Sequence, residues 1–275
     1  MTDAFSVRFW GVRGSIACPG PHTQRYGGNT SCVEVVCGEH RIILDGGTGL
    51  RALGNHLVTT GPVSADMLFT HTHFDHVCGI PFFAPFFHEQ NDFRIWAGHL
   101  PPGSGIHRTL QEMMTAPLFP APLDVFRAGL EYIDFRAGKT LELQPGVQVR
   151  TAPLNHPNEA TGYRIDFDGR SVCYITDTEH LPGALDQNIL ELINSSDLLI
   201  YDATYSDEEF EQYKGWGHST WQQGVRLAEE AGVGALVIFH HDPNKDDDDM
   251  DRIAHLVKKM RPGSIVASEG MVLVP

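Results

Sequence analysis

The chain has 275 residues, of which 41% are hydrophobic, and it carries a net charge of −15 from 35 acidic and 20 basic residues. This length suffices for a large buried core, and with no linker-like segment it predicts a single domain over residues 1–275. The strongly negative charge repels phosphate backbones, which disfavours a nucleic-acid polymer as the partner.

The N-terminus and the cysteines bear on where the protein works. Residues 1–14 contain no charged segment followed by an apolar one, and no run approaches the ~20 apolar residues of a membrane span. The five cysteines are an odd number without a CxxC pair, so we expect reduced thiols in the core. These features predict a cytoplasmic protein without a membrane partner.

Short β-rich runs and helical patterns interleave along the chain. Strands are predicted, in chain order, at residues 7–10, 32–37, 41–44, 67–69, 93–97, 147–151, 163–167, 172–175, 198–201, 236–239 and 265–267. Helices are predicted at residues 50–58, 106–115, 185–193, 220–231 and 250–260. The early strands have mostly hairpin spacing, so we expect an α/β fold in which two packed, mixed β-sheets are flanked by helices.

A dense group of metal-capable side chains follows the predicted strand that ends at residue 69. The run THTHFDH supplies His71, His73, Asp75 and His76 within six residues. In an extended segment side chains alternate, so His71 and His73 point to the same side and reach one ion. Asp75 and His76, where the chain turns, are placed to serve a second ion. A buried core needs no such cluster, and the run predicts a metal site.

The HxHxDH run resembles the signature of the metallo-β-lactamase superfamily. Three later residues at strand ends match the superfamily's remaining ligands in order, namely His156, Asp177 and His240. The resemblance implies a four-layer αβ/βα sandwich with a paired-metal site. It implies a first metal on His71, His73 and His156. It implies a second metal on Asp75, His76 and His240, with Asp177 and a hydroxide bridging the two ions. The nitrogen and oxygen ligand set suits Zn²⁺ best, and such sites also accept Mn²⁺ or Fe²⁺.

A second motif, Gly217-His218-Ser219-Thr220, follows the segment LLIYDATY at residues 198–205. Together they resemble the phosphodiesterase branch of the superfamily, which contains ribonuclease Z and uses a similar histidine in phosphodiester cleavage. We expect Ser219 to be the N-cap of the next helix, with Gln222 completing a capping box, so that His218 lies just outside the helix start. His218 then donates a proton to the leaving oxygen or stabilises its charge, and Asp202 orients it. The candidate catalytic residues are Asp75 and His218.

The interval between His156 and Asp177 distinguishes this chain from ribonuclease Z. That family carries a protruding tRNA-gripping arm there, whereas this chain has room for one hairpin. With the negative charge, this favours hydrolysis of a small phosphodiester such as a cyclic nucleotide. Three alternatives stay open: ribonuclease Z-like processing of RNA 3′ ends, thioester or lactam hydrolysis, and a non-enzymatic metal-binding or sensor role. The resemblance alone implies a homodimer.

Several further residues have two interpretations each. Arg13 and Arg25 lie in glycine-rich segments and either bind phosphate or are solvated residues of tight turns. The aromatic segment from Pro81 to Phe87 either walls the substrate pocket or packs in the core. Asp45, in a DGGTG strand-to-helix turn, is expected to support the ligand histidines. His241 points away from His240 along a strand, so its role is supporting or purely structural. The acidic run at residues 246–249 is a solvated loop or a helix start.

Overall fold

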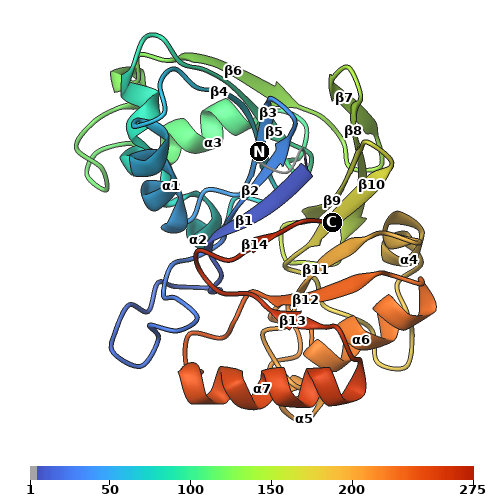
Figure 1. Ribbon diagram of the computed structural model, residues 1–275. Coiled ribbons are helices and arrows are strands. Elements are labelled where there is room, and N and C mark those ends of the chain that lie inside the picture. The colour runs from blue at the N-terminus through green and yellow to red at the C-terminus, as the bar shows by residue number, and fades with distance from the viewer. Residues whose placement is uncertain (1–4) are drawn as a thin grey trace.

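Two seven-stranded β-sheets form the centre of the computed structural model, which describes residues 5–275 (Figure 1). In spatial order the first sheet contains β14 (Val272–Leu273), β1 (Phe5–Gly11), β2 (Cys32–Cys37), β3 (His40–Leu44), β4 (Ser64–Phe69), β5 (Asp92–Ala97) and β6 (Gly129–Asp134). The second contains β13 (Ile265–Val266), β12 (Ala235–Phe239), β11 (Leu198–Asp202), β10 (Arg170–Ile175), β9 (Ala160–Phe167), β8 (Val147–Leu154) and β7 (Thr140–Gln144).

Both sheets are mixed, as the hairpin spacing predicts. The first sheet is antiparallel from β14 to β3 and parallel from β3 to β6. The second is antiparallel from β7 to β10 and parallel from β10 to β13. The first and last strands of the described chain pair in the first sheet, where Val7 of β1 lies opposite Leu273 of β14. Each half therefore repeats the same order of hairpins followed by parallel crossovers.

Helices cover the outer face of each sheet (Figure 1). Those packed on the first sheet are α1 (Gly49–Leu57) and α3 (Ile106–Met113), with 3₁₀ turns at Ile80–Phe82, Ala84–Phe87 and Leu123–Val125. Those packed on the second are α4 (Gln187–Ile193), α6 (Trp221–Glu230) and α7 (Asp247–Met260). Two short helices, α2 (Phe74–Val77) and α5 (Asp207–Phe210), sit in loops. No helix within residues 5–275 combines the length and apolarity needed to cross a membrane.

The core has three layers of apolar side chains, one between the sheets and one under each set of helices. Strand β1 alternates buried and half-buried residues, whereas β11 is buried along its whole length because a helix covers its second face. Burying a large aliphatic side chain contributes about 1.5–3 kcal/mol, so these layers hold the sheets together. The predicted four-layer αβ/βα sandwich of two mixed sheets is confirmed.

The differences from the predicted elements lie at the sheet edges and helix starts. Strands β6 and β7 were not predicted, because edge strands such as GLEYID carry exposed polar residues among the apolar ones. Strand β14 was not predicted because it is only two residues long. Helix α7 begins at Asp247 with Asp246 as its N-cap in a capping box, so the acidic run is a helix start. The prediction of Ser219 as N-cap of α6 was wrong, since the side chain of Thr220 accepts from the amide of Gln223.

Candidate metal centre

The seven predicted metal ligands meet at one end of the sandwich, although they come from distant parts of the chain. Four follow β4 in the loop that enters α2, and His156, Asp177 and His240 follow β8, β10 and β12. His73 has an extended backbone before α2 begins, with φ −62° and ψ 154°. Asp75 and His76 lie within α2, where the chain turns as predicted. Strand ends from both sheets thus build the site.

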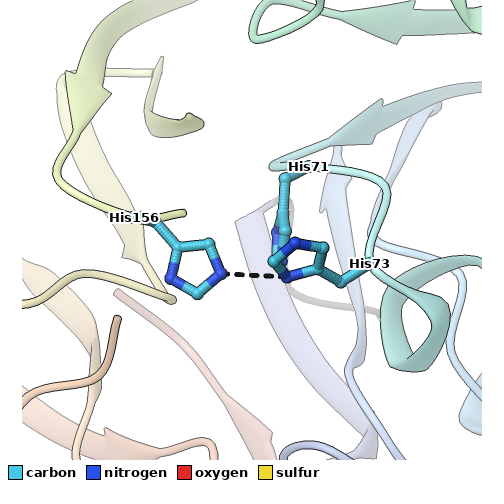
Figure 2. Close-up of side chains that lie close together, drawn as sticks. All are labelled: His71, His73 and His156. Carbon is cyan, nitrogen blue, oxygen red and sulfur yellow. Dashed lines mark hydrogen bonds between the residues drawn. The ribbon is translucent and has the colours of Figure 1, made fainter. Parts of the chain in front are cut away.

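His71, His73 and His156 form the first of two groups (Figure 2). Their candidate ligand atoms lie within 4.8 Å of one another. The Nε2 atom of His156 is 3.0 Å from the Nδ1 atom of His73. Figure 2 shows the three imidazoles converging from two separate loops. This is the trio that the resemblance to the superfamily implies for one ion.

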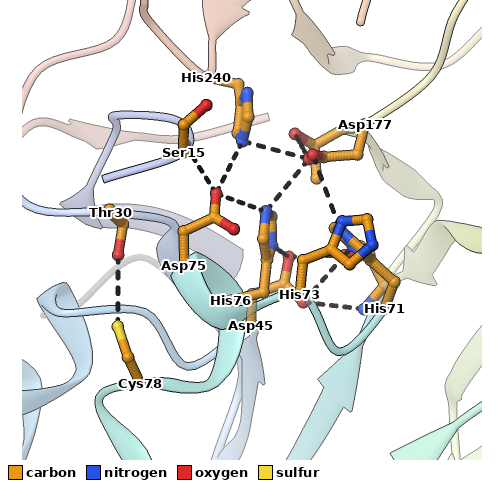
Figure 3. Close-up of polar contacts among 12 residues, drawn as sticks. Ser15, Thr30, Asp45, His71, His73, Asp75, His76, Cys78, Asp177 and His240 are labelled. Carbon is orange, nitrogen blue, oxygen red and sulfur yellow. Dashed lines mark hydrogen bonds and ion pairs between the residues drawn. The ribbon is translucent and has the colours of Figure 1, made fainter. Parts of the chain in front are cut away.

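Asp75, His76 and His240 form the second group (Figure 3). The Oδ2 atom of Asp75 lies 3.3 Å from Nε2 of His76 and 3.5 Å from Nε2 of His240. The backbone amide of Ser15 donates to the same oxygen at 2.7 Å and holds the carboxylate in place. The second trio is therefore assembled as well.

Asp177 lies between the two groups and divides its oxygens between them (Figure 3). Its Oδ1 atom faces the first group, at 3.7 Å from Nε2 of His71 and 3.9 Å from Nε2 of His156. Its Oδ2 atom faces the second group, at 3.2 Å from Nε2 of His76 and 3.3 Å from Nε2 of His240. A carboxylate in this position can bridge two cations.

The donor atoms suit divalent metal ions. The Nε2 atoms of His71, His76 and His240 are buried and have no hydrogen-bond partner. Leaving a buried polar atom unpaired costs about 1–3 kcal/mol, so three together around two carboxylates require an explanation. Neutral imidazole nitrogens and carboxylates are ligands that Zn²⁺ and similar divalent cations prefer. The cluster is a site for divalent metal ions.

The opposite ring nitrogens are anchored from behind. The Nδ1 atom of His76 lies 2.9 Å from the carboxylate of Asp45, as the sequence predicts for that residue. The Nδ1 atom of His156 lies 2.7 Å from the carbonyl oxygen of Gly217. Because these partners only accept, each Nδ1 carries a proton, and Nε2 is the ring atom that faces the site and would bind a metal ion. Thr70 and Thr204 contact Nδ1 of His71 and His240 at 3.1 Å each.

The two carboxylates of the site stay charged. Burial disfavours the charged form of Asp177, yet His240, His76 and His71 together hold its pKa well below the usual range. Burial likewise opposes the charge on Asp75, and His76 and His240 lower its pKa strongly. The site therefore presents two negative charges to an incoming cation.

Three site residues adopt a left-handed backbone, which non-glycine residues rarely do. Asp45 has a φ of 59°, Asp177 of 57° and His240 of 58°. Each directly follows a parallel strand or lies two residues beyond one, at the point where the chain must turn its side chain into the site. Such conformations cost about 1–3 kcal/mol each and concentrate where function requires them.

Two glycines allow close approach to the ligand histidines. A Cβ atom at Gly14 would lie 2.4 Å from the ring of His240, and one at Gly217 would lie 2.3 Å from Nδ1 of His156. Gly217 also has a φ of +85°, which favours glycine. Gly14 therefore allows the loop after β1 to pass close to the ring of His240.

His218 lies beside the metal cluster. Its Nδ1 atom is 3.1 Å from Oδ2 of Asp202 and 3.7 Å from Oδ1 of Asp177. Burial would lower the pKa of His218, but the charge of Asp202 and its hydrogen bond raise that pKa to about 9. Ser219, rather than capping α6, contacts Nδ1 of His180 at 2.9 Å. The structure thus places Asp202 where it orients His218, as predicted.

Arg13 and Arg25, the two candidate phosphate-binding residues, contact other parts of the fold and not the metal cluster. Arg13 is fully buried and donates to the carbonyl oxygens of Gly27, Asp242 and Lys245, so the phosphate-binding interpretation is wrong for it. Arg25 pairs with Asp248 and Asp251 on α7 at the surface.

His241 and the aromatic segment from Pro81 to Phe87 also serve mainly the core. The Nε2 atom of His241 lies 2.9 Å from the carbonyl oxygen of Ala267, away from the metal cluster. In the aromatic segment Phe83 and Phe86 are fully buried, while Phe82 and Phe87 are exposed. Core packing therefore accounts for half of its phenylalanines.

Sequence reasoning missed several residues that hold the candidate metal ligands in position. Ser15 holds Asp75, Gly217 holds His156 and Thr204 contacts His240. Thr70, directly before the motif, was the easiest to find, since it also donates to Asp45. The others are ordinary loop residues whose partners are distant in the sequence.

Comparison with known proteins agrees with this geometry. Residues 40–241 match the family described as the beta-lactamase superfamily domain. A ribonuclease Z from Haloarcula marismortui is 27% identical over 85% of this chain and 85% of its own length. A ribonuclease Z from Brevibacillus brevis is 37% identical over 30% of this chain, which is 24% of its own length. The chain belongs to the beta-lactamase superfamily.

Solved structures share the whole fold. Zn²⁺-bound PqqB from Methylobacterium extorquens superposes with a TM-score of 0.73 at 18% identity, over 98% of this chain and 100% of that one. The metallo-β-lactamase fold protein YhfI from Bacillus subtilis gives 0.72 at 18%, over 99% and 100%. A diphosphatase of the PhnP family gives 0.72 at 18%, over 98% of each chain. With its site and relatives, the chain is a metal-dependent hydrolase of the metallo-β-lactamase fold, related to ribonuclease Z.

Proposed function

We propose that the protein hydrolyses a small phosphodiester, such as a cyclic nucleotide, with two divalent metal ions. The observation that carries this proposal is the position of Asp177, whose two oxygens face two separate groups of ligand atoms. A single-ion site needs only one such group, whereas phosphodiester hydrolysis uses charge stabilisation on both the attacking and the leaving oxygen.

The chain has a complete ligand set for each ion. His71, His73 and His156 would hold the first ion, Asp75, His76 and His240 would hold the second, and Asp177 lies where it could serve both. When bound, the ions supply electrostatic stabilisation of the phosphoryl oxygens and acidify the attacking water. The four nitrogen and carboxylate donors around each position, and the zinc in the PqqB neighbour, support Zn²⁺, with Mn²⁺ or Fe²⁺ as alternatives.

His218 supplies the proton that the leaving group needs. Its Nδ1 atom donates to Asp202, so Nε2 is the ring atom left for the substrate. As the bond between phosphorus and the leaving oxygen breaks, Nε2 gives its proton to that oxygen. Asp202 also accepts the backbone amides of Thr178 and Thr204, which fix the carboxylate that orients the ring. The position of His218, with Nδ1 3.7 Å from Oδ1 of Asp177, supports a direct role for His218 in the reaction.

The size of the substrate is inferred from charge and from one hairpin. Strands β9 and β10 pair directly and turn at Asp168 and Gly169, so the interval from His156 to Asp177 contains no protruding arm. The net charge of −15 further disfavours a polynucleotide. Both observations support a small diester.

A second candidate function is the processing of RNA 3′ ends. The relatives named ribonuclease Z support it, since one aligns over 85% of both chains. An endonuclease of this kind should bind tRNA precursors despite the charge, and a gel-shift assay with such a precursor separates the two functions.

The first experiment compares metal-loaded wild-type protein with the Asp177→Ala variant. The substrates are bis(p-nitrophenyl) phosphate and 2′,3′- and 3′,5′-cyclic nucleotides. Turnover by the wild type that is lost in the variant supports a two-metal phosphodiesterase. Bound metal with no turnover of any diester would refute the proposal and direct the search to thioesters and lactams.

A further inference from the structure

Trp216 is unusually exposed for a tryptophan. Its relative exposure is 63%, whereas Trp221, five residues later, is 5% exposed. Exposing an indole to water forgoes a large hydrophobic gain, and exposed aromatic side chains are frequent in binding sites. The position of Trp216 therefore needs a reason.

The segment around Trp216 is held in a defined conformation. One carboxylate oxygen of Glu179 accepts the backbone amides of Gly215 at 2.7 Å and Gly217 at 2.9 Å. The Tyr213 ring meets the indole edge-on, with centroids 5.6 Å apart, and stacks on Tyr205 at 4.3 Å. An exposed indole in a fixed segment is a preorganised surface and not a fraying loop.

The same segment is attached directly to the metal centre. The residue after Trp216 is Gly217, whose carbonyl oxygen is 2.7 Å from Nδ1 of His156. The next residue is His218, the candidate proton donor. Glu179, which clamps the segment, lies two residues beyond Asp177. The indole is thus adjacent in the chain to the residues that would meet the leaving group.

A second exposed aromatic residue borders the same site. Phe74, between His73 and Asp75, is 72% exposed. Its neighbour His73 contacts Asn158 through Nε2 at 3.2 Å, and Gly217 packs so closely on Pro157 that a Cβ atom would lie 2.4 Å from its ring. Trp216 is thus linked to Phe74 through Gly217, Pro157, Asn158 and His73, partly as neighbours in the chain and partly by these two contacts.

We propose that Trp216 determines substrate specificity by stacking on the planar base of a nucleoside phosphodiester whose phosphate reaches the metal centre. This inference rests on the proposed phosphodiesterase function. Every nucleobase has a π-face that stacks on an aromatic ring, and this contact requires no basic surface, in keeping with the acidic chain.

The test uses binding as well as catalysis. The affinities of adenosine 5′-monophosphate and ribose 5-phosphate for the metal-loaded protein are measured by calorimetry, because the two ligands differ only in the base. We expect the wild type to bind the nucleotide roughly tenfold more tightly, Trp216→Ala to lose this preference and Trp216→Phe to retain part of it. Leu256→Ala, which removes an exposed apolar side chain from α7, is the matched control and should retain the full preference.

Catalysis separates failure of this inference from failure of the proposed function. With 2′,3′-cyclic AMP the Trp216→Ala variant should show a KM raised roughly tenfold, while its turnover of the base-free glycerol 1,2-cyclic phosphate matches that of the wild type. Equal affinities of the wild type for the two ligands, or an unchanged preference in the alanine variant, would overturn the stacking role even if diesters are hydrolysed. A base preference without diester turnover would support the stacking surface and refute the phosphodiesterase. A variant that changes only from dimer to monomer in size-exclusion chromatography would assign Trp216 to a subunit interface and overturn the inference.

Discussion

The Nδ1 atom of His76 lies 2.9 Å from Oδ2 of Asp45, and both side chains are fully buried. The same carboxylate accepts the amide and hydroxyl of Thr70 and the hydroxyl of Tyr174 at 2.8–3.0 Å. A carboxylate with this many donors is fixed in place, so it also fixes the orientation and the protonated nitrogen of His76. Asp45 therefore orients the candidate ligand His76, although it is not one of the seven candidate ligands itself.

The Asp45→Asn variant should bind metal roughly 10- to 100-fold more weakly, because an amide can present its NH₂ group to His76 and reverse the ring's protonation. Competition with a chromogenic chelator measures the affinity. Asp66→Asn is the matched control, since Asp66 is equally buried but contacts His40, Arg94 and Trp96 far from the site. Equal metal affinity in the two variants would contradict the role of Asp45.

Replacing His218 by alanine should reduce diester turnover by roughly 10²- to 10⁴-fold, the usual contribution of a general acid. Metal content should not change, because His218 is engaged with Asp202 and the other histidines supply the ligand set. Elemental analysis and steady-state kinetics check both points. His255→Ala, an exposed histidine of α7, serves as the control. If the His218 variant loses its metal, the residue is a ligand and our assignment is wrong.

Gly14 offers a test of close packing at the metal centre. A methyl group there would lie 2.4 Å from the His240 ring, so Gly14→Ala should displace that ligand and reduce bound metal and turnover roughly tenfold or more. Gly20→Ala adds the same methyl group where no atom lies within 4 Å, and should change stability by less than about 0.5 kcal/mol. Similar behaviour of the two variants would show that the loop yields and His240 stays in place.

The cysteines predict a pattern of thiol reactivity. All five are free, and Cys32, Cys37 and Cys173 are buried. Burial raises the pKa of Cys37 and Cys173 to about 12 and that of Cys32 well above its usual value, which suppresses the reactive thiolate. Ellman's reagent should therefore leave these three unmodified in the native protein and detect five thiols after unfolding. Fewer than five in the unfolded chain would reveal a disulfide.

Local sequence patterns sufficed for the elements that are buried or densely functional. The run from His71 to His76 predicts a metal site because four ligand residues so close together have no other physical use. The central strands were predictable because their side chains are apolar, while the edge strands β6 and β7 were not, since at least half of the residues in each are exposed. The N-cap at Thr220 was misplaced by one residue because Ser219 has the same capping chemistry.

Residue types and periodicity along the chain predict the α/β architecture and a metal site at the run from His71 to His76. The remaining ligands and the hydrolytic chemistry were implied by the resemblance of the sequence motifs to a known superfamily. The three-dimensional structure was needed to show which oxygen of Asp177 faces which histidines and that Arg13 donates to backbone carbonyls of the fold. It was also needed to show that Gly217, the neighbour of Trp216, contacts the ligand His156. Those facts depend on contacts between residues tens to hundreds of positions apart. Such contacts are set by the packing of two whole sheets, and no local pattern in the chain records them.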